Sequence, residues 1–481
     1  MKFIITIILS ITVVLSACLV THEFDTACGL LAASVSSSGN NVPRTPADDF
    51  TYNVIKELTS APYMGRLPGT PGNKMAVSFI SERYKDLGLK QPPGYNSYLQ
   101  TFQQQLIVQN SATVLVTRRK TGEVTGEYNH LSDYIGLPLW PNTKIQGLID
   151  APLVSITDLK QLSRNNQEIY GKVLLISSEL VHSLPHDHLQ ADGIVNKLLS
   201  LGSRIEGSII NFDNRRDGYF HVSKSMKRLF RGSKKYNNKN GQVLLYCSDA
   251  AYPYLKEAAE REDNVYISVD FSLEECYSSN VIGVIEGTDR SNNDHIIIAA
   301  HLDHIGDNKD ETYNPGALDN ASGIAGLLEI ARTLLNKTEL PQKDIIFIAT
   351  NGEEEYFAGS NYYVGHPILP LKNATMINLD MIGAKGAEYL EVCYPGNNSV
   401  ELSRQIASDG LEIGINTRSS YILSSDHVTF SVCGVPAVML KHLQPVQRHH
   451  TMQDSFEITM DINKLQEAID LVVYYIEQTA Y

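Results

Sequence analysis

The stretch HIIIAAHLDH, residues 295–304, decides the fold class of this chain. Its apolar run is typical of a β-strand, and polar side chains follow where the strand ends. Similar apolar runs cover residues 344–350, 374–381 and 436–440. The segment after Asp319 instead has apolar residues at helical spacing. Strands that alternate with helices predict an α/β fold whose sheet is joined by helical crossovers.

The composition of the 481 residues is that of a globular protein, with 43% hydrophobic and 20% charged residues. It excludes a disordered chain, a collagen-like fibre and a polytopic membrane protein. The 40 Lys and Arg residues against 54 Asp and Glu residues give a net charge of −14, which argues against a nucleic-acid partner. At about 150 residues per domain, the length predicts two or three domains.

Helices are also predicted at both ends of the folded part. Residues 50–58 have apolar side chains four apart, and residues 76–87 form a second apolar face before Gly88. Between these helices, the segment GRLPGTPG, residues 65–72, is too rich in Gly and Pro to be helix or strand. A last amphipathic helix is predicted over residues 462–476.

The pattern changes between residues 120 and 276. Short apolar runs such as 171–176 and 243–246 alternate there with polar turns, which predicts an inserted β-rich domain over residues 120–276. The main domain would then comprise residues 46–119 and 277–481.

Several basic and histidine-containing segments are interpreted as ordinary polar surface. The segment 221–241 is basic and has no acidic residue, and contact with an anionic polymer or lipid headgroup is the alternative to a solvated loop. No metal-binding role is predicted for His182, His186, His188, His304, His366 and His442.

The N-terminal residues predict export. A basic residue precedes the uncharged apolar run 3–17, which is shorter than the about 20 residues of a membrane span. Residues 1–17 therefore match a signal peptide. The following LSAC sequence, which ends at Cys18, resembles the lipobox of bacterial lipoproteins. Lipid on Cys18 would place the protein in the periplasm, at the outer membrane or at the cell surface, with residues 18–45 as a tether. The alternative is an ordinary signal peptide and a secreted protein.

The cysteines indicate no metal site of their own. Besides Cys18 the chain has five, and no spacing among them resembles a cysteine-type zinc site. An exported protein can form disulfides. The pairings to test are Cys247 with Cys276 and Cys393 with Cys433.

The residues that carry chemistry follow the predicted strands, where open α/β sheets place their sites. Each cluster alone has a simpler explanation, such as a helix cap or a solvated turn. Together they supply imidazoles and carboxylates from one domain: His301 and Asp303, Asp319, Glu353 and Glu354, Asp380, Asp426, and His449 and His450. An unpaired carboxylate within an apolar strand, such as Asp380, is costly and predicts a cation.

A charge balance favours two metal ions. The positive charge of two Zn²⁺ ions would be balanced by three carboxylates and one bridging hydroxide, while the two imidazole ligands stay neutral. This set of nitrogen and oxygen ligands suits a two-metal hydrolase, and zinc, cobalt or manganese would all fit it.

The motifs resemble the co-catalytic di-zinc aminopeptidases of metallopeptidase family twenty-eight, in the subgroup with an inserted protease-associated domain. The resemblance rests on six motifs in the same order: HxD at 301–303, LDNASG at 318–323, GEE at 352–354, NLDMIG at 378–383, SDH at 425–427 and HTxxD at 450–454. It implies the zinc exopeptidase fold, a mixed β-sheet sandwiched by helices, and peptide substrates. It also implies that the insert shapes access to the site, with a passive spacer as the alternative.

The resemblance implies a role for each site residue. Asp319 would bridge two Zn²⁺ ions, with His301 and Asp380 at one and Glu354 and His450 at the other. Glu353 would be the general base, and Asp303 would orient His301.

One residue departs from the family pattern. Many relatives have Tyr before the last His ligand, where this chain has His449. An imidazole N–H there would polarise the scissile carbonyl.

The motifs leave the direction of peptide trimming open. Removal of N-terminal residues is the favoured activity, and a carboxypeptidase or dipeptidase on the same site is the alternative. A glutaminyl cyclase normally uses one zinc, and the complete ligand set argues against it. A non-catalytic receptor is the remaining alternative, against which the retained Glu353 argues.

Overall fold

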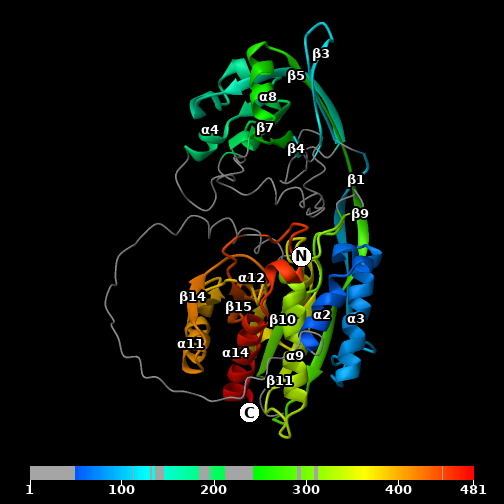
Figure 1. The fold of residues 1–481 in the computed structure, drawn as a ribbon, viewed down its shortest axis with the longest axis vertical. Coiled ribbons are helices and arrows are strands. Elements are labelled where there is room, and N and C mark those ends of the chain that lie inside the picture. Colours follow the sequence, from blue (N-terminus) through cyan, green and yellow to red (C-terminus); the bar gives the residue numbers. More distant parts are fainter. Residues whose placement is uncertain are drawn as a thin grey trace, which may run out of the picture. The chain divides into compact units, whose positions relative to one another are not determined.

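The computed structural model describes residues 49–111, 113–130, 133–135, 146–183, 194, 197–211, 242–289, 294–307, 312–446 and 448–481 (Figure 1). The predicted signal peptide and tether, Cys18, the basic segment 221–241, His186, His188 and the side chain of His182 lie outside the described residues. Within the described residues, no helix combines the length and hydrophobicity that a membrane crossing needs.

The centre of the main domain is a sheet of four parallel strands. They are β10 (His295–His301), β11 (Asp344–Thr350), β12 (Ala374–Leu379) and β15 (Ala437–His442), in the order β15-β12-β10-β11. All four are the apolar runs predicted as strands, with ends that differ by two residues at most. Their nearly complete burial explains why each is apolar at almost every position.

Antiparallel strands flank this parallel centre, so the sheet is mixed. Strand β9 (Asn264–Ile285) pairs antiparallel with β11, and β13 (Leu390–Tyr394) pairs antiparallel with β15. Strand β14 (Thr417–Tyr421) continues the sheet parallel to β13.

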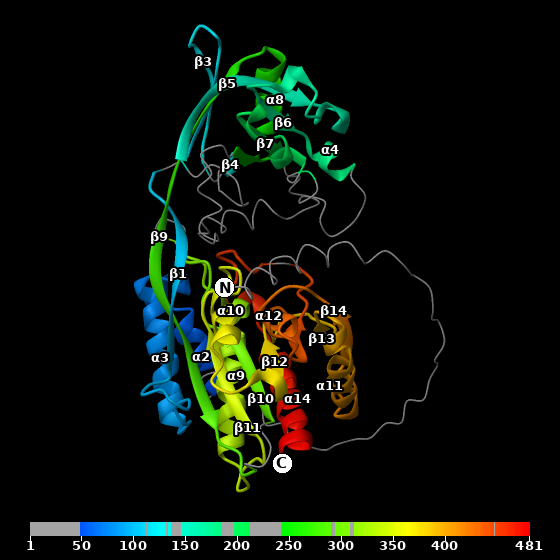
Figure 2. The same cartoon turned by 180° about the vertical axis from the view of Figure 1, so that it is seen from behind.

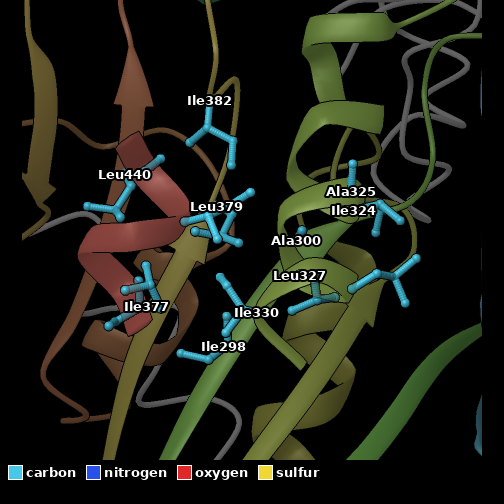
Figure 3. Close-up of a cluster of buried hydrophobic side chains, with 14 of the residues drawn as sticks. Ile298, Ala300, Ile324, Ala325, Leu327, Ile330, Ile377, Leu379, Ile382 and Leu440 are labelled. Atoms are coloured by element: carbon cyan, nitrogen blue, oxygen red, sulfur yellow. The ribbon is translucent and has the colours of Figure 1, made fainter. Parts of the chain in front are cut away.

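Helices cover both faces of the sheet (Figures 1 and 2). On one face, α2 (Phe50–Leu58), α9 (Ser322–Leu335), α11 (Val400–Glu412) and α14 (Ile462–Ala480) contribute to one apolar core. In Figure 3, Ile298 and Ala300 of β10 lie close to Ile324, Leu327 and Ile330 of α9.

The alternate side chains of the same strands form a second core. Ile297 and Ala299 of β10 pack there with Tyr363 and Phe430. Tyr363 belongs to α10 (Ala358–Gly365) and Phe430 to α12 (His427–Val432). This alternation follows from the two-residue period of a strand. The prediction of a mixed sheet sandwiched by helices is therefore confirmed.

The predicted N-terminal helices are confirmed as α2 and α3 (Pro71–Leu87). Asp49 caps α2 through its side chain, and Gly88 ends α3 with a positive φ of 89°. The Gly- and Pro-rich segment between them is less irregular than predicted. A short 3₁₀ helix, η2 (Ala61–Arg66), ends within it, and α3 begins within it at Pro71.

The predicted insert has an apolar core of its own. Strands β5 (Gln146–Ile156), β6 (Val173–Ile176), β7 (Gly207–Asn211) and β8 (Val243–Cys247) form a parallel sheet. The predicted apolar runs are β6 and β8. The helices α4 (Ser178–His182) and α8 (Tyr252–Glu260) were not predicted.

A long strand connects the two parts of the chain. Strand β9 pairs with β1 (Leu99–Gln109) along residues 271–281, and its residues 264–270 pair with β5 and, over 264–268, with β2 (Val114–Arg118). It runs without interruption across the expected boundary between residues 276 and 277, and the domain boundaries remain a prediction.

The remaining elements are short. They are the strands β2 (Val114–Arg118), β3 (Val124–Tyr128) and β4 (Tyr134–Ile135), the helix α13 (Phe456–Thr459), the distorted helical turn η6 (Ala317–Ala321), and the 3₁₀ turns η3 (Leu159–Gln161), η4 (Gln167–Ile169), η5 (Gly202–Arg204), η7 (Leu371–Asn373) and η8 (Asn397–Ser399).

Neither of the two cysteine pairings to test is formed, because Cys247, Cys276, Cys393 and Cys433 are all free thiols. Cys393 is buried in β13 beside Ser420, whereas Cys433 is exposed at the end of α12. Cys247 ends β8 in the core of the insert, whereas Cys276 lies in β9 opposite Gln104.

Candidate metal centre

The predicted site residues meet at the carboxyl ends of the parallel strands, where α/β sheets place their ligands. His301 is the last residue of β10, and Asp303 follows it. Glu353 and Glu354 follow β11, and Asp380 follows β12. Asp319 lies in η6, directly before α9, and His449 and His450 lie in the loop after β15.

Two groups of potential ligands share one carboxylate. One group is His301, Asp319 and Asp380, and the other is His304, Asp319, Glu354 and His450. Within each group, the candidate ligand atoms lie within 4.8 Å of one another. The structure therefore brings together all five predicted ligands around Asp319.

Each oxygen of Asp319 faces a different imidazole. Oδ1 of Asp319 lies 3.2 Å from Nε2 of His301, which is also 3.6 Å from Oδ1 of Asp380. Oδ2 of Asp319 lies 3.0 Å from Nε2 of His450, which is also 2.9 Å from Oε2 of Glu354. A carboxylate in this position can bridge two cations.

His304 is a member of the second group that sequence reasoning missed. Its Nδ1 lies 3.0 Å from Oε1 of Glu354, and its side chain is fully buried. Its ring centroid is 5.5 Å from that of His450. The available signal was its position three residues after His301, which by itself does not distinguish a functional histidine from a structural one.

Asp303 organises the loop that carries both glutamates. Its Oδ1 accepts a hydrogen bond from the backbone N–H of Glu353 and its Oδ2 one from that of Glu354, both at 3.2 Å. The same Oδ1 lies 3.7 Å from Nδ1 of His301. One buried carboxylate thus faces a histidine ligand and fixes the backbone of the adjacent loop.

The backbone around Asp319 is also held by polar side chains. Asp454 accepts hydrogen bonds from the N–H groups of Leu318 (2.9 Å) and Asp319 (3.1 Å). Asn320, which follows a cis peptide bond, donates to the carbonyl of Leu379 and accepts from the N–H of Met381. Leu379 and Met381 flank Asp380, so Asn320 ties Asp319 to the strand end that carries Asp380.

Asp426 is buried beside the site but supports the scaffold. It accepts hydrogen bonds from the hydroxyls of Thr350 and Ser360, both at 2.5 Å. Burial raises its pKa to about 6 against the opposing effect of these hydrogen bonds. The SDH motif thus buttresses the end of β11, and Asp426 belongs to neither ligand group.

The electrostatics of the site call for a cation. Burial would lower the pKa of His301 and of His450, but the neighbouring carboxylates hold both pKa values well above the usual range. Burial would raise the pKa of Glu354, but His450 and His304 outweigh it and lower the pKa to about 2. Without metal, protons on the imidazoles offset part of the carboxylate charge.

Several buried polar atoms of the two ligand groups have no hydrogen bond to the described part of the chain. They include both ring nitrogens of His301, Nε2 of His304 and Oδ1 of Asp380. Such atoms are costly to bury unless something else satisfies them. A metal ion would do so, and imidazole nitrogen with carboxylate oxygen is a ligand set that zinc accepts. The residues therefore fit the metal that the motifs imply.

Glu353 and His449 lie beside the ligands without belonging to either group. Burial raises the pKa of Glu353 well above its usual value, and the nearby Glu354 and Asp380 act in the same direction. Burial lowers the pKa of His449 to about 4, so this ring is neutral at pH 7. Its Nδ1 is buried without a hydrogen bond to any described residue, and its ring centroid is 5.1 Å from that of His450.

Comparison with known sequences identifies the part of the chain that carries the site. Residues 280–476 match the model of peptidase family M28. Aminopeptidase YwaD of Bacillus subtilis is 33% identical over 207 residues, which are 40% of this chain and 43% of that protein. A vacuolar membrane protease of Ajellomyces capsulatus is 29% identical over 167 residues, 33% of this chain and 16% of that protein. The chain thus spans less than half the length of these curated relatives.

Solved structures share the fold over most of the chain. An aminopeptidase from Aneurinibacillus sp. strain AM-1 has a TM-score of 0.65 and 21% identity, with 90% of this chain and 93% of that chain covered. BSAP, a zinc aminopeptidase from Bacillus subtilis, has a TM-score of 0.58 and 23% identity, with 90% and 95% covered. At these identities the likeness establishes the fold.

Proposed function

Because residues 280–476 belong to peptidase family M28, we propose that this protein is an exported metal-dependent aminopeptidase that removes N-terminal residues from peptides. The observation that carries the proposal is the convergence of the two ligand groups on Asp319, with Glu353 beside them. The site would hold two zinc ions, one with His301 and Asp380 and the other with Glu354 and His450.

The bound zinc would lower the pKa of water toward about 7 and polarise the peptide carbonyl. Glu353 would accept the proton of the attacking water, and its raised pKa, which makes it a stronger base than an exposed glutamate, supports this role. It would then return the proton to the leaving amine. The neutral ring of His449 would donate a hydrogen bond to the developing oxyanion.

The surrounding residues keep these groups in place. Asp303 holds the N–H groups of Glu353 and Glu354, so the general base and a ligand move together. Asp454 holds the backbone of Asp319. Preorganised ligands reduce the rearrangement that metal binding requires, and partners of this kind contribute to metal affinity.

A peptide digest tests the proposal directly. The purified protein, loaded with zinc, is incubated with peptides of mixed sequence, and the products are identified by mass spectrometry. We expect stepwise loss of N-terminal residues that stops on chelation and resumes with added zinc. Glu353→Gln should reduce the rate by about 10²- to 10⁴-fold, the usual contribution of a general base. Glu82→Gln, at an exposed position of α3, is the matched control.

The digest also separates the alternatives. Loss of residues from the C-terminus would keep the metal centre and replace the aminopeptidase by a carboxypeptidase. Release of products only from dipeptides would indicate a dipeptidase. No cleavage by zinc-loaded protein would contradict the proposed function.

The expected location belongs to the same proposal. We expect the signal peptide to be removed and Cys18 to carry the lipid that anchors the protein to a membrane. Peptides at the cell envelope are then the substrates.

A further inference from the structure

Arg66 is the most deeply buried cation near the metal centre. It lies in the Gly- and Pro-rich segment 65–72, and its side chain is fully buried. Arginine is almost never fully buried without a partner. The backbone of Arg66 has a positive φ of 51°, which is uncommon for a residue other than glycine. Both features indicate that the fold requires this side chain at this place.

The guanidinium joins three separate segments through backbone carbonyls. Nε donates to Leu302 O (2.9 Å), and Nη2 donates to Gly316 O (2.9 Å). Nη1 donates to Leu58 O (2.7 Å) and to Pro315 O (2.8 Å).

Two of these acceptors belong to the loops that carry metal ligands. Leu302 lies between His301 and Asp303, and Gly316 is three residues before Asp319. One rigid, planar group therefore sets the spacing between a histidine ligand and the carboxylate shared by both groups.

The backbone beside Arg66 is fixed just as closely. Gly306 N–H donates to the carbonyl of Gly65 at 3.0 Å. A Cβ on Gly65 would lie 2.6 Å from the carbonyl oxygen of Asn314, so only glycine allows this approach. Asn73 donates to the carbonyl of Arg66 and exchanges hydrogen bonds with Asn351, two residues before Glu353. The position of the guanidinium is thus determined from both sides.

The charge of Arg66 is balanced at a distance. All four of its acceptors are neutral carbonyls, and among the described residues no carboxylate forms an ion pair with it. Burial lowers its pKa to about 10, whereas the fields of Asp303, Asp454, Asp319 and Glu354 act in the opposite direction. Arg66 therefore stays charged at pH 7, and the carboxylates of the site balance its charge without direct contact.

We infer that Arg66 is a positioning residue of the metal centre. Its guanidinium fixes the strand end that carries His301 relative to the loop that carries Asp319. This inference rests on the proposed function for the identity of the metal. Lysine cannot replace Arg66 fully, because an ammonium group is a single point that cannot reach carbonyls in three segments at once.

The test compares zinc affinity in variants of the full chain. Arg66→Gln removes the charge and most donors, and Arg66→Lys keeps the charge but loses the planar fork of donors. Arg418→Gln is the matched control, since Arg418 pairs with Glu391 across β13 and β14. Zinc affinity is measured by competition with a chromophoric chelator. Thermal unfolding of the metal-free proteins reports stability separately.

We expect Arg66→Gln to bind zinc at least about 10-fold more weakly than wild type, Arg66→Lys to be intermediate, and Arg418→Gln to be unchanged. On a cleaved peptide, kcat should fall while KM changes little, because Arg66 is buried and does not contact substrate. A purely structural role predicts a lower melting temperature with unchanged zinc affinity of the folded protein, and that result would overturn the inference.

The remaining outcomes are also decisive. If Arg66→Gln does not fold, Arg66→Lys carries the test, and wild-type zinc affinity in that variant would overturn the inference. Zinc binding by wild type without peptide cleavage would remove the proposed function but leave the comparison of affinities valid. Absence of zinc binding by wild type would overturn both.

Discussion

Replacing His304 should weaken one metal position and spare the other. Its Nδ1 lies 3.0 Å from Oε1 of Glu354, while Oε2 of Glu354 faces His450. His304 is fully buried and packs against Gly316, where a Cβ would lie 2.6 Å from the imidazole Cδ2. Removal of the imidazole therefore leaves Oε1 of Glu354 without the partner that helps to fix its rotamer.

The expected magnitude follows from the role of such partners. Loss of a hydrogen bond to a metal ligand typically costs about 10- to 100-fold in metal affinity. This corresponds to about 1.4–2.7 kcal/mol. The upper end is expected here, because the buried carboxylate of Glu354 owes its pKa of about 2 partly to His304.

Two variants distinguish the effect of losing the hydrogen bond of His304 from the effect of losing the volume of its side chain. His304→Leu fills most of the space without a donor, whereas His304→Gln keeps an N–H donor. Metal per chain is measured by equilibrium dialysis over a series of free zinc concentrations, with His366→Leu as the exposed control. We expect one of two binding steps to weaken in His304→Leu and to recover partly in His304→Gln. Two binding steps of wild-type affinity in His304→Leu would refute this reasoning.

Three further predictions concern the backbone, the pH dependence and the anchor. Gly316→Ala should destabilise the protein and weaken zinc binding, because φ is +63° and a Cβ would lie 2.5 Å from the carbonyl oxygen of Asp319; an unchanged melting temperature would contradict this. Burial lowers the pKa of His442 to about 3, and its Nδ1 accepts a hydrogen bond from Gly383 N–H. An unfolded histidine titrates near about 6.5, so the unfolded state binds the proton first and stability is lost as the pH falls below that value. His442→Asn should reduce this loss by up to about 1.4 kcal/mol per pH unit in urea unfolding of metal-free protein between pH 7 and pH 4.5, and an unchanged slope would argue against it. Cys18→Ser should abolish lipid attachment and release the protein from membranes, which fractionation and mass spectrometry would detect.

The sequence predicted the strands whose side chains are buried on both faces of the sheet. Strands β10, β11, β12 and β15 are buried on both faces, so hydrophobicity alone marks them. The convergence of His301, Glu354 and Asp380 could be predicted because they lie at or just after strand ends, and parallel strands bring their carboxyl ends together.

The sequence did not reveal elements whose residues alternate between environments. Strand β14, TRSSY, lies at the sheet edge and has mostly exposed or partly exposed side chains, so it carries no hydrophobic signal. Strand β9 passes from one apolar core to another, and a change of neighbours within one strand leaves no mark in the pattern. The cysteine pairings failed for a related reason, since sequence distance does not give distance in space.

The sequence also did not reveal side-chain contacts between residues that are far apart along the chain. Arg66 lies in a segment whose composition predicts a loop. Only the structure shows that its guanidinium donates to the carbonyls of Leu302, Pro315 and Gly316. In the sequence, nothing distinguishes His304 from a structural histidine. Its contact with Glu354 through Nδ1 is visible only in the folded chain.

Gly316 is where these two hidden contacts meet. Its carbonyl accepts from Arg66, and its α-carbon faces the ring of His304, so both side chains act on the segment that leads to Asp319. Asp319 is shared by both ligand groups, and a shift of its loop would change both metal positions at once. Arg66 and Asp454 hold this loop through its backbone, while His304 fixes the partner ligand Glu354. The geometry of the shared carboxylate is therefore set by the fold, and a metal ion at the proposed site would bind to an arrangement that the fold has already made.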